Sequence, residues 1–139
     1  MAAEAQTVTV DSIIAPGGIE RRRRTRPVGA TKPVDFTYLR RFTLANRSLE
    51  REVLDLFIEH APRYVDDLRA ASTAKEWHAA AHTLKGAARG IGAWRVARVA
   101  EGAERVDFVD KDRCDFALDS ADEALDEAIG FIRNIFRAW

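Results

Sequence analysis

The sequence has little cysteine and no net charge. These features limit the disulfides and the charged partners that we expect. Cys114 is the single cysteine among 139 residues, so no disulfide can form within the chain, which fits a reducing compartment. Basic and acidic residues number 22 each, so the overall charge favours neither a polyanionic nor a polycationic partner. No stretch approaches the ~18 consecutive apolar residues of a transmembrane helix, and the N-terminus lacks a charged start followed by an apolar run. We therefore expect a cytoplasmic protein that does not enter a membrane.

The sequence also lacks the motifs by which proteins hold nucleotides and metal ions. It contains neither a glycine-rich phosphate loop nor a Walker motif. Its His, Cys, Asp and Glu residues do not cluster with the spacing of metal ligands. We therefore expect no cofactor or metal ion held by this chain, and no nucleotide-binding kinase domain of its own.

Helix-breaking residues and basic charge concentrate in residues 1–33. This segment holds three of the four prolines, and its six basic and three acidic side chains make it about +3. We interpret 1–33 as a flexible basic tail and 34–139 as the folded domain. The Arg21–Arg24 run suggests an alternative function as an adaptor for nucleic acid or an acidic partner. One such run without interleaved aromatic residues is weak evidence for that alternative.

From Asp35 onward, apolar residues recur at intervals of three and four, which is the spacing of amphipathic helices. Asp35 is the expected N-cap of a short helix through Phe42, with Phe36 and Leu39 as its other apolar residues. Four longer helices are predicted, over residues 46 or 48 to about 71, 74 to about 91, 93 to about 107, and about 115 to 137. Pro62 should kink the first of these. The predicted fold is all-α, an antiparallel up-down four-helix bundle with an additional short N-terminal helix.

The predicted helix over residues 74–91 has a core face and an exposed face. Its start is marked by a capping-box sequence, Thr73 to Glu76. At ~100° per residue, one narrow arc contains the apolar side chains: Trp77, Ala81, Leu84, Ala88 and Ile91. The other side contains His82, Lys85, Gly86 and Arg89. His82 lies about 140° from the core direction and is therefore predicted to be exposed.

An exposed imidazole beside a cation and a glycine suits a phosphoryl acceptor. Neutral imidazole is a competent nucleophile near pH 7. Lys85 can disfavour the imidazolium by like-charge repulsion and then pair with phosphoryl oxygens. Gly86 costs the helix ~1 kcal/mol relative to alanine, and we interpret it as clearance for another protein's active site. Arg89 is a candidate to hold the phosphoryl group or a partner carboxylate, with plain solvation as the equal alternative.

For other residues near this face, the sequence gives weaker evidence of a function in the site. We interpret His78, one turn before His82, as solvated surface, with tuning of the site as the alternative. His60 on the preceding helix is read as structural or solvated. Arg95 and Arg98 on the following helix are candidates for an additional positive patch.

The run His82-Thr83-Leu84-Lys85-Gly86-Ala87-Ala88-Arg89-Gly90-Ile91-Gly92 resembles the signature of histidine phosphotransfer (HPt) domains. In that signature a His precedes Leu-Lys-Gly, and a second glycine follows six residues after the first. The resemblance covers about residues 34–137 and includes Leu56-Phe57, Pro62 and Glu104. Ala87 and Ala88 stand where the family has small or hydroxyl side chains, and Ala103 replaces its usual leucine, departures that affect packing more than chemistry.

The resemblance implies a covalent phosphocarrier rather than an autonomous enzyme. His82 would be the phosphoacceptor, Lys85 its electrostatic neighbour and Gly86 the clearance residue. The phosphoryl group would move reversibly between His82 and an aspartyl phosphate of a response-regulator receiver domain, which would supply an acidic pocket and Mg²⁺. The implied partners are receiver domains and a hybrid sensor histidine kinase, and we expect a monomer. The alternative is a docking module that binds receivers without carrying phosphate.

Overall fold

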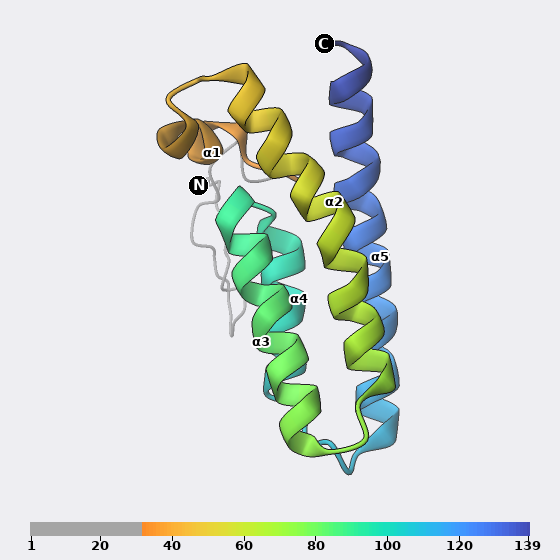
Figure 1. Ribbon diagram of the computed structural model, residues 1–139. Helices are drawn as coiled ribbons and strands as arrows, with labels where there is room; N and C mark the ends of the chain where they lie inside the picture. The colour runs from red at the N-terminus through yellow and green to blue at the C-terminus, as the bar shows by residue number, and fades with distance from the viewer. Residues whose placement is uncertain (1–31) are drawn as a thin grey trace, which may run out of the picture. The chain divides into compact units, whose positions relative to one another are not determined.

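The computed structural model describes residues 32–139, which fold into five α-helices and contain no strand. In chain order the helices are α1 (Phe36–Thr43), α2 (Arg47–Ala70), α3 (Ala74–Ile91), α4 (Trp94–Glu104) and α5 (Lys111–Arg137). Figure 1 shows α2 to α5 running alternately down and up beside one another, with α1 at the end where α2 begins. Each long helix packs on the next in sequence, and α5 closes the bundle against α2. The predicted all-α bundle with a short additional helix is confirmed.

Side-chain caps explain where four of the five helices in residues 32–139 begin, α4 being the exception. Four N-cap residues each accept a hydrogen bond from a backbone N–H three residues later: Asp35, Asn46, Thr73 and Asp110. Asp110 makes α5 begin at Lys111, so the predicted start near 115 is wrong. α4 ends at Glu104, three residues before the predicted end near 107. The apolar pattern registers buried positions and not caps, which is why both boundaries were misplaced.

The capping box predicted at the start of α3 forms, but one of its two contacts involves Ser72 in place of Thr73. Thr73 accepts a hydrogen bond from the N–H of Glu76, as the motif predicts. The Glu76 carboxylate accepts hydrogen bonds from both the N–H and the hydroxyl of Ser72, one residue earlier than the motif requires. These bonds lower the pKa of Glu76 below its ordinary value, the bond from the Ser72 backbone contributing most. α3 nevertheless begins at Ala74, where the sequence places it.

The turn between α3 and α4 is locked to the start of α1. Gly92 ends α3 with a φ of 76°, a conformation that other residues rarely adopt. A Cβ at this position would lie 3.0 Å from the backbone oxygen of Asp35, so the close approach also requires glycine. The Asp35 N–H donates to the oxygen of Gly92, and Trp94 Nε1 donates to the Asp35 carboxylate, both at 3.0 Å. The short helix is therefore fixed to the end of the bundle through this turn.

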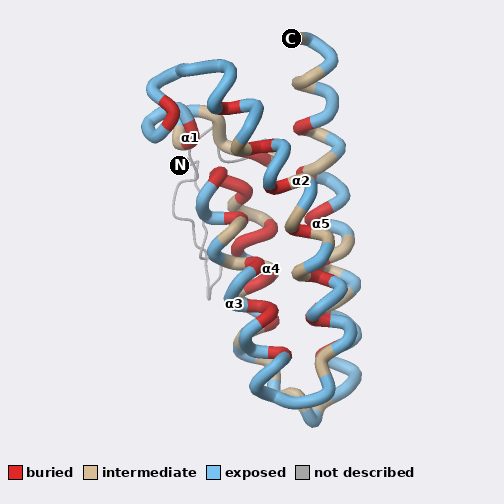
Figure 2. The backbone as a smooth tube through the Cα atoms, viewed as in Figure 1, coloured by how far each residue is buried: buried red, intermediate tan, exposed pale blue. Residues whose placement is uncertain are grey.

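Many of the buried residues of the bundle interior are alanines. Figure 2 shows the buried positions along the helices, largely on the sides that face the bundle axis. The buried alanines include Ala61, Ala88, Ala93, Ala100, Ala121, Ala124 and Ala128. Small residues let helix axes approach closely. The five residues predicted on the core face of α3 are all buried: Trp77, Ala81, Leu84, Ala88 and Ile91. In α1 only Leu39 of the three apolar residues is fully buried, and Phe42 is exposed.

Pro62 lies inside α2, which continues through it as one helix. A proline within a helix removes one backbone hydrogen bond and favours a bend. Figure 1 shows the axis of α2 changing direction between its two halves, in agreement with the predicted kink.

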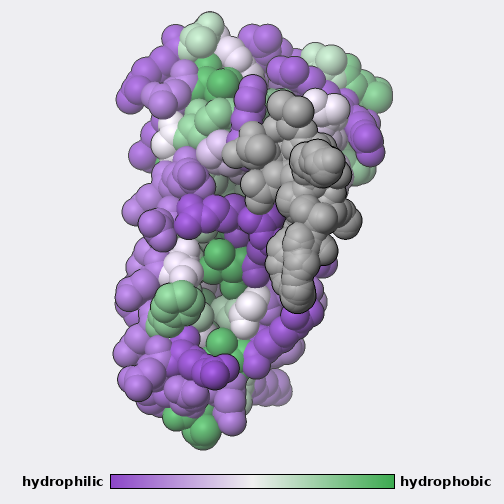
Figure 3. Space-filling view, turned by 180° about the vertical axis from the view of Figure 1, so that it is seen from behind, coloured by the Kyte–Doolittle hydropathy of each residue, from purple (hydrophilic) through white to green (hydrophobic). Residues whose placement is uncertain are grey.

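The outer surface is mostly polar. Figure 3 views the molecule from behind and shows small apolar patches within a largely hydrophilic face. None of the helices in residues 32–139 is long and apolar enough to cross a membrane. The tail predicted over residues 1–33, with its Arg21–Arg24 run, lies almost wholly outside the described residues.

Candidate functional site

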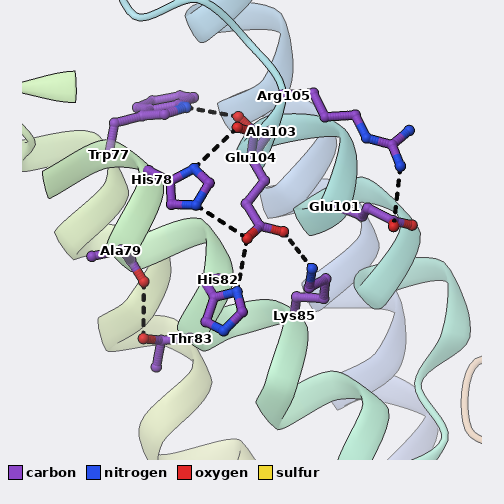
Figure 4. Close-up of polar contacts among 10 residues, drawn as sticks. All are labelled: Trp77, His78, Ala79, His82, Thr83, Lys85, Glu101, Ala103, Glu104 and Arg105. Carbon is purple, nitrogen blue, oxygen red and sulfur yellow. Dashed lines mark hydrogen bonds and ion pairs between the residues drawn. The ribbon is translucent and has the colours of Figure 1, made fainter. Parts of the chain in front are cut away.

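His82 lies on the outer face of α3, and its side chain is 67% exposed, as the helical spacing predicts. One of its ring nitrogens nevertheless makes a hydrogen bond. Nδ1 lies 2.7 Å from Oε2 of Glu104, the last residue of α4. Figure 4 shows the Glu104 side chain reaching from α4 toward α3, between two histidines and a lysine. The site is therefore built across two helices rather than on α3 alone.

The Glu104 carboxylate is the centre of this cluster. Only 10% of its side chain is exposed, and its other oxygen, Oε1, lies 2.5 Å from the Lys85 ammonium. The hydrogen bond from Lys85, and after it the one from His82, lowers the pKa of Glu104 below its ordinary value of 4.5, although burial opposes this shift. Glu104 is therefore ionised at neutral pH and can only accept hydrogen bonds.

The ionised carboxylate determines which nitrogen of His82 carries the proton. Because Glu104 only accepts, Nδ1 of His82 must be the donor in their hydrogen bond. A neutral imidazole has one N–H, so its Nε2 then carries a free lone pair. Among the described residues nothing hydrogen-bonds to Nε2. A carboxylate that fixes an imidazole tautomer in this way is the arrangement found in nucleophile and metal sites.

Lys85 is more constrained than sequence reasoning suggests. Its side chain is only 15% exposed, and its ammonium is paired with Glu104 rather than free in solvent. The sequence identified Lys85 as a neighbour of His82, one turn away. It did not reveal that both side chains bind the same carboxylate, one at each oxygen.

Gly86 opens onto a groove between α2 and α3. A Cβ at Gly86 would meet no atom of the described residues within 4 Å, apart from the helix's own backbone. The α2–α3 groove has a volume of about 270 Å³ and a mainly apolar lining: Val53, Leu56, Phe57, His60, Ala61, Tyr64, Gly86, Ala87, Gly90 and Ile91. Leu56 in this lining is exposed. Gly86 therefore leaves space without a side chain at the edge of an apolar surface, one helical turn from His82.

The arginines near the site have acidic partners. Arg89, the candidate ligand for a phosphoryl group, lies 3.7 Å from Glu101 and makes no contact with the cluster around Glu104. Arg95 pairs with Glu123 and Glu127 of α5. These two carboxylates reduce the contribution of Arg95 to the predicted positive patch with Arg98, and the patch stays a prediction.

His78 is exposed, as predicted, but its ring also contacts Glu104. Its Nδ1 lies 3.3 Å from the main-chain oxygen of Glu104, and its Nε2 lies 3.5 Å from Oε2 of the same residue. The rings of His78 and His82 are stacked, with centroids 6.4 Å apart and planes 11° from parallel. The i,i+4 spacing of the two histidines places them on one face. That spacing does not predict that Glu104 of α4 lies beside the two histidines.

Comparison with known proteins agrees with this geometry. The family model of the Hpt domain matches residues 52–133, more than half of the chain. The chain belongs to the Hpt domain family. Searches of the curated proteins and of the solved structures give no match. The resemblance found in the sequence is thereby confirmed.

Membership in the Hpt family assigns a general role. Hpt domains are phosphocarriers rather than kinases, and they act in two-component signalling with receiver domains and histidine kinases. In this Hpt domain all the elements of the cluster described above lie within the matched residues. No group of three His, Cys, Asp or Glu side chains in residues 32–139 is arranged to hold a metal ion.

Proposed function

We propose that this Hpt domain carries a phosphoryl group on Nε2 of His82 and exchanges it with an aspartyl phosphate of a receiver domain. The observation that supports this most directly is the hydrogen bond of Nδ1 to Glu104, because it leaves the Nε2 lone pair free. The high exposure of the His82 side chain makes that lone pair accessible to a partner protein. His78 is a poorer acceptor, since both of its nitrogens face oxygens of Glu104.

The proposed transfer is a direct displacement at phosphorus. The Nε2 lone pair of His82 attacks the phosphorus of the aspartyl phosphate, a nitrogen–phosphorus bond forms, and the bond from phosphorus to the aspartyl oxygen breaks. The partner aspartate leaves as a free carboxylate. His82 keeps its Nδ1 proton, so its ring becomes a phosphorylated imidazolium. The reverse reaction passes the group to another receiver.

The neighbours of His82 favour this step in different ways. Glu104 orients the ring and stabilises the positive charge that the imidazole gains as the new bond forms, as carboxylates do for catalytic histidines. Lys85 holds Glu104 at its other oxygen and places a positive charge within one turn of the incoming phosphoryl group. Arg89 lies two turns from His82, and its contribution would be to the partner surface.

We assign receiver docking to the α2–α3 groove. Its apolar lining and the exposed Leu56 suit an apolar face of a partner protein. Gly86 keeps the edge nearest His82 free of side chains, so a receiver's active site can approach the imidazole. This chain would hold no cofactor, and the Mg²⁺ needed for aspartyl phosphate chemistry would come with the receiver.

The test is phosphoryl transfer from phosphorylated receiver domains. We expect acid-labile phosphate on His82, loss of label in His82→Gln, and an unchanged helical fold in that variant. Lys75→Gln, an exposed change in the first turn of α3, is the matched control and should retain the label. A receiver that binds without transferring phosphate would establish the docking-module alternative. Label on His78 or His60 would refute the assignment of His82.

A further inference from the structure

Two consecutive residues of α3 bind the last two main-chain oxygens of α4. Trp77 Nε1 donates to the oxygen of Ala103 at 2.8 Å, and His78 Nδ1 lies 3.3 Å from the oxygen of Glu104. The last carbonyls of a helix have no partner within the helix. Among the described residues, His78 provides the one hydrogen bond to the Glu104 main chain oxygen. These contacts fix the end of α4 against α3.

The two contacts differ in character. Trp77 is buried and belongs to the core, so its bond has an evident structural role. The side chain of His78 is 62% exposed and buries little apolar surface. Because a carbonyl oxygen only accepts hydrogen bonds, Nδ1 of His78 must be its donor. In this orientation Nε2 of His78 lies 3.5 Å from Oε2 of Glu104, the same oxygen that binds His82. Because a neutral imidazole has one N–H, Nε2 can donate to that oxygen only when the His78 ring is protonated.

We infer that His78 is a positioning residue for the phosphoacceptor, acting through Glu104. It holds the main chain of Glu104 through Nδ1 and stacks against the ring of His82, and in the protonated ring its Nε2 can also donate to the carboxylate. The inference rests on the function proposed for His82. Its consequence is that the carboxylate stays where Nδ1 of His82 can donate to it, which keeps Nε2 in the reactive form. Small displacements of such orienting groups have large effects on rate.

The matched variants are His78→Ala and His78→Asn. Alanine removes both contacts to Glu104. The asparagine amide can reproduce the donor at Nδ1 and keep the main-chain contact, but it is too short to face the carboxylate. Lys75→Ala, on the same helix and without a contact to Glu104, is the control.

The first measurement does not depend on phosphorylation. Nitrogen-15 NMR of the ring reports which nitrogen of His82 is protonated. We expect the Nδ1–H form in the unmodified protein and in the Lys75→Ala control. His78→Ala should show a mixture of the two tautomers of His82. His78→Asn should show a fraction of the Nδ1–H form between that of the unmodified protein and that of His78→Ala. An unchanged tautomer in His78→Ala would overturn the inference.

The second measurement is transfer from a phosphorylated receiver under saturating conditions. We expect His78→Ala to lower the rate constant of transfer about tenfold, the effect typical of groups that orient a reactive ligand. The receiver concentration for half-maximal rate should not change. In a Glu104→Ala background, His78→Ala should have no further effect, since the residue acts through that carboxylate.

Several outcomes would contradict this role. If His78→Ala lowers the rate constant of transfer equally in the presence and absence of the Glu104 side chain, His78 acts independently of the carboxylate. A change in half-saturation alone would make it a docking residue. If the unmodified protein shows the Nδ1–H form but takes up no phosphate, the proposed function fails while the tautomer result still tests His78.

Discussion

Gly86 offers a substitution in which stability and transfer should change in opposite directions. The residue lies in the middle of α3, where glycine costs the helix ~1 kcal/mol relative to alanine. A Cβ at this position would meet no atom of the described residues within 4 Å outside its own helix. Gly86→Ala should therefore raise the free energy of unfolding by up to ~1 kcal/mol without any steric penalty. In a domain of this size that corresponds to an increase in melting temperature of roughly 4–8 °C.

The functional effect should grow with the size of the new side chain. Gly86→Gln should keep the helix and remain at least as stable, yet place an amide beside His82 at the edge of the α2–α3 groove. We expect phosphorylation by a receiver to fall steeply, because the partner's active site can no longer approach. The assays are thermal unfolding followed by circular dichroism, and the initial rate of transfer to His82.

Gly130 in α5 provides the matched control. A Cβ there likewise meets no atom of the described residues within 4 Å, but the residue lies on a different helix from the site. Gly130→Ala and Gly130→Gln should change stability as their Gly86 counterparts do and leave transfer unchanged. If Gly86→Gln destabilises the bundle, or if the two glutamine variants lose transfer equally, the role of Gly86 as clearance is refuted.

Three further predictions follow from the cluster and the turn. The pKa of Glu104 is lowered, so its stabilising effect should be complete above its unfolded-state pKa and be lost as the pH falls through its folded-state pKa. The stability difference between the protein and Glu104→Gln, measured by urea unfolding at decreasing pH, should therefore become smaller as the solution becomes more acidic. A constant difference would exclude the ion pair as its source. Lys85→Ala should slow transfer more than it weakens receiver binding, and it should return the pKa of Glu104 toward the ordinary value. A loss explained by affinity alone would remove Lys85 from the chemistry. Gly92→Ala should destabilise the domain by about 1–3 kcal/mol, because its φ is positive and its Cβ would meet Asp35. Unchanged thermal unfolding would contradict this.

The helices and the exposed face of α3 could be predicted because they depend on local spacing. Apolar residues every three or four positions define a helix and its buried side wherever it packs. The same spacing placed His82, Lys85 and Gly86 together on the opposite side. These features needed no knowledge of the neighbouring helices.

The contacts of Glu104 depend on how α3 and α4 meet, and spacing does not contain this information. His82 and Glu104 are 22 positions apart in the sequence. In the sequence, only the family resemblance points to Glu104. A helix extended to 107, as predicted, would also have hidden the contact of His78, because the contact requires a helix end at Glu104. The pairing of Arg95 with α5 was missed for the same reason.

The central claim is that the phosphoryl group resides on Nε2 of His82 while Nδ1 keeps its proton. Phosphorus–nitrogen coupling in the nitrogen-15-labelled protein, phosphorylated by a receiver domain, tests this at the level of single atoms. We predict coupling of phosphorus to Nε2 of His82, with the proton still on Nδ1 beside Glu104. Coupling to Nδ1 of His82, or to either nitrogen of His78, would contradict the account.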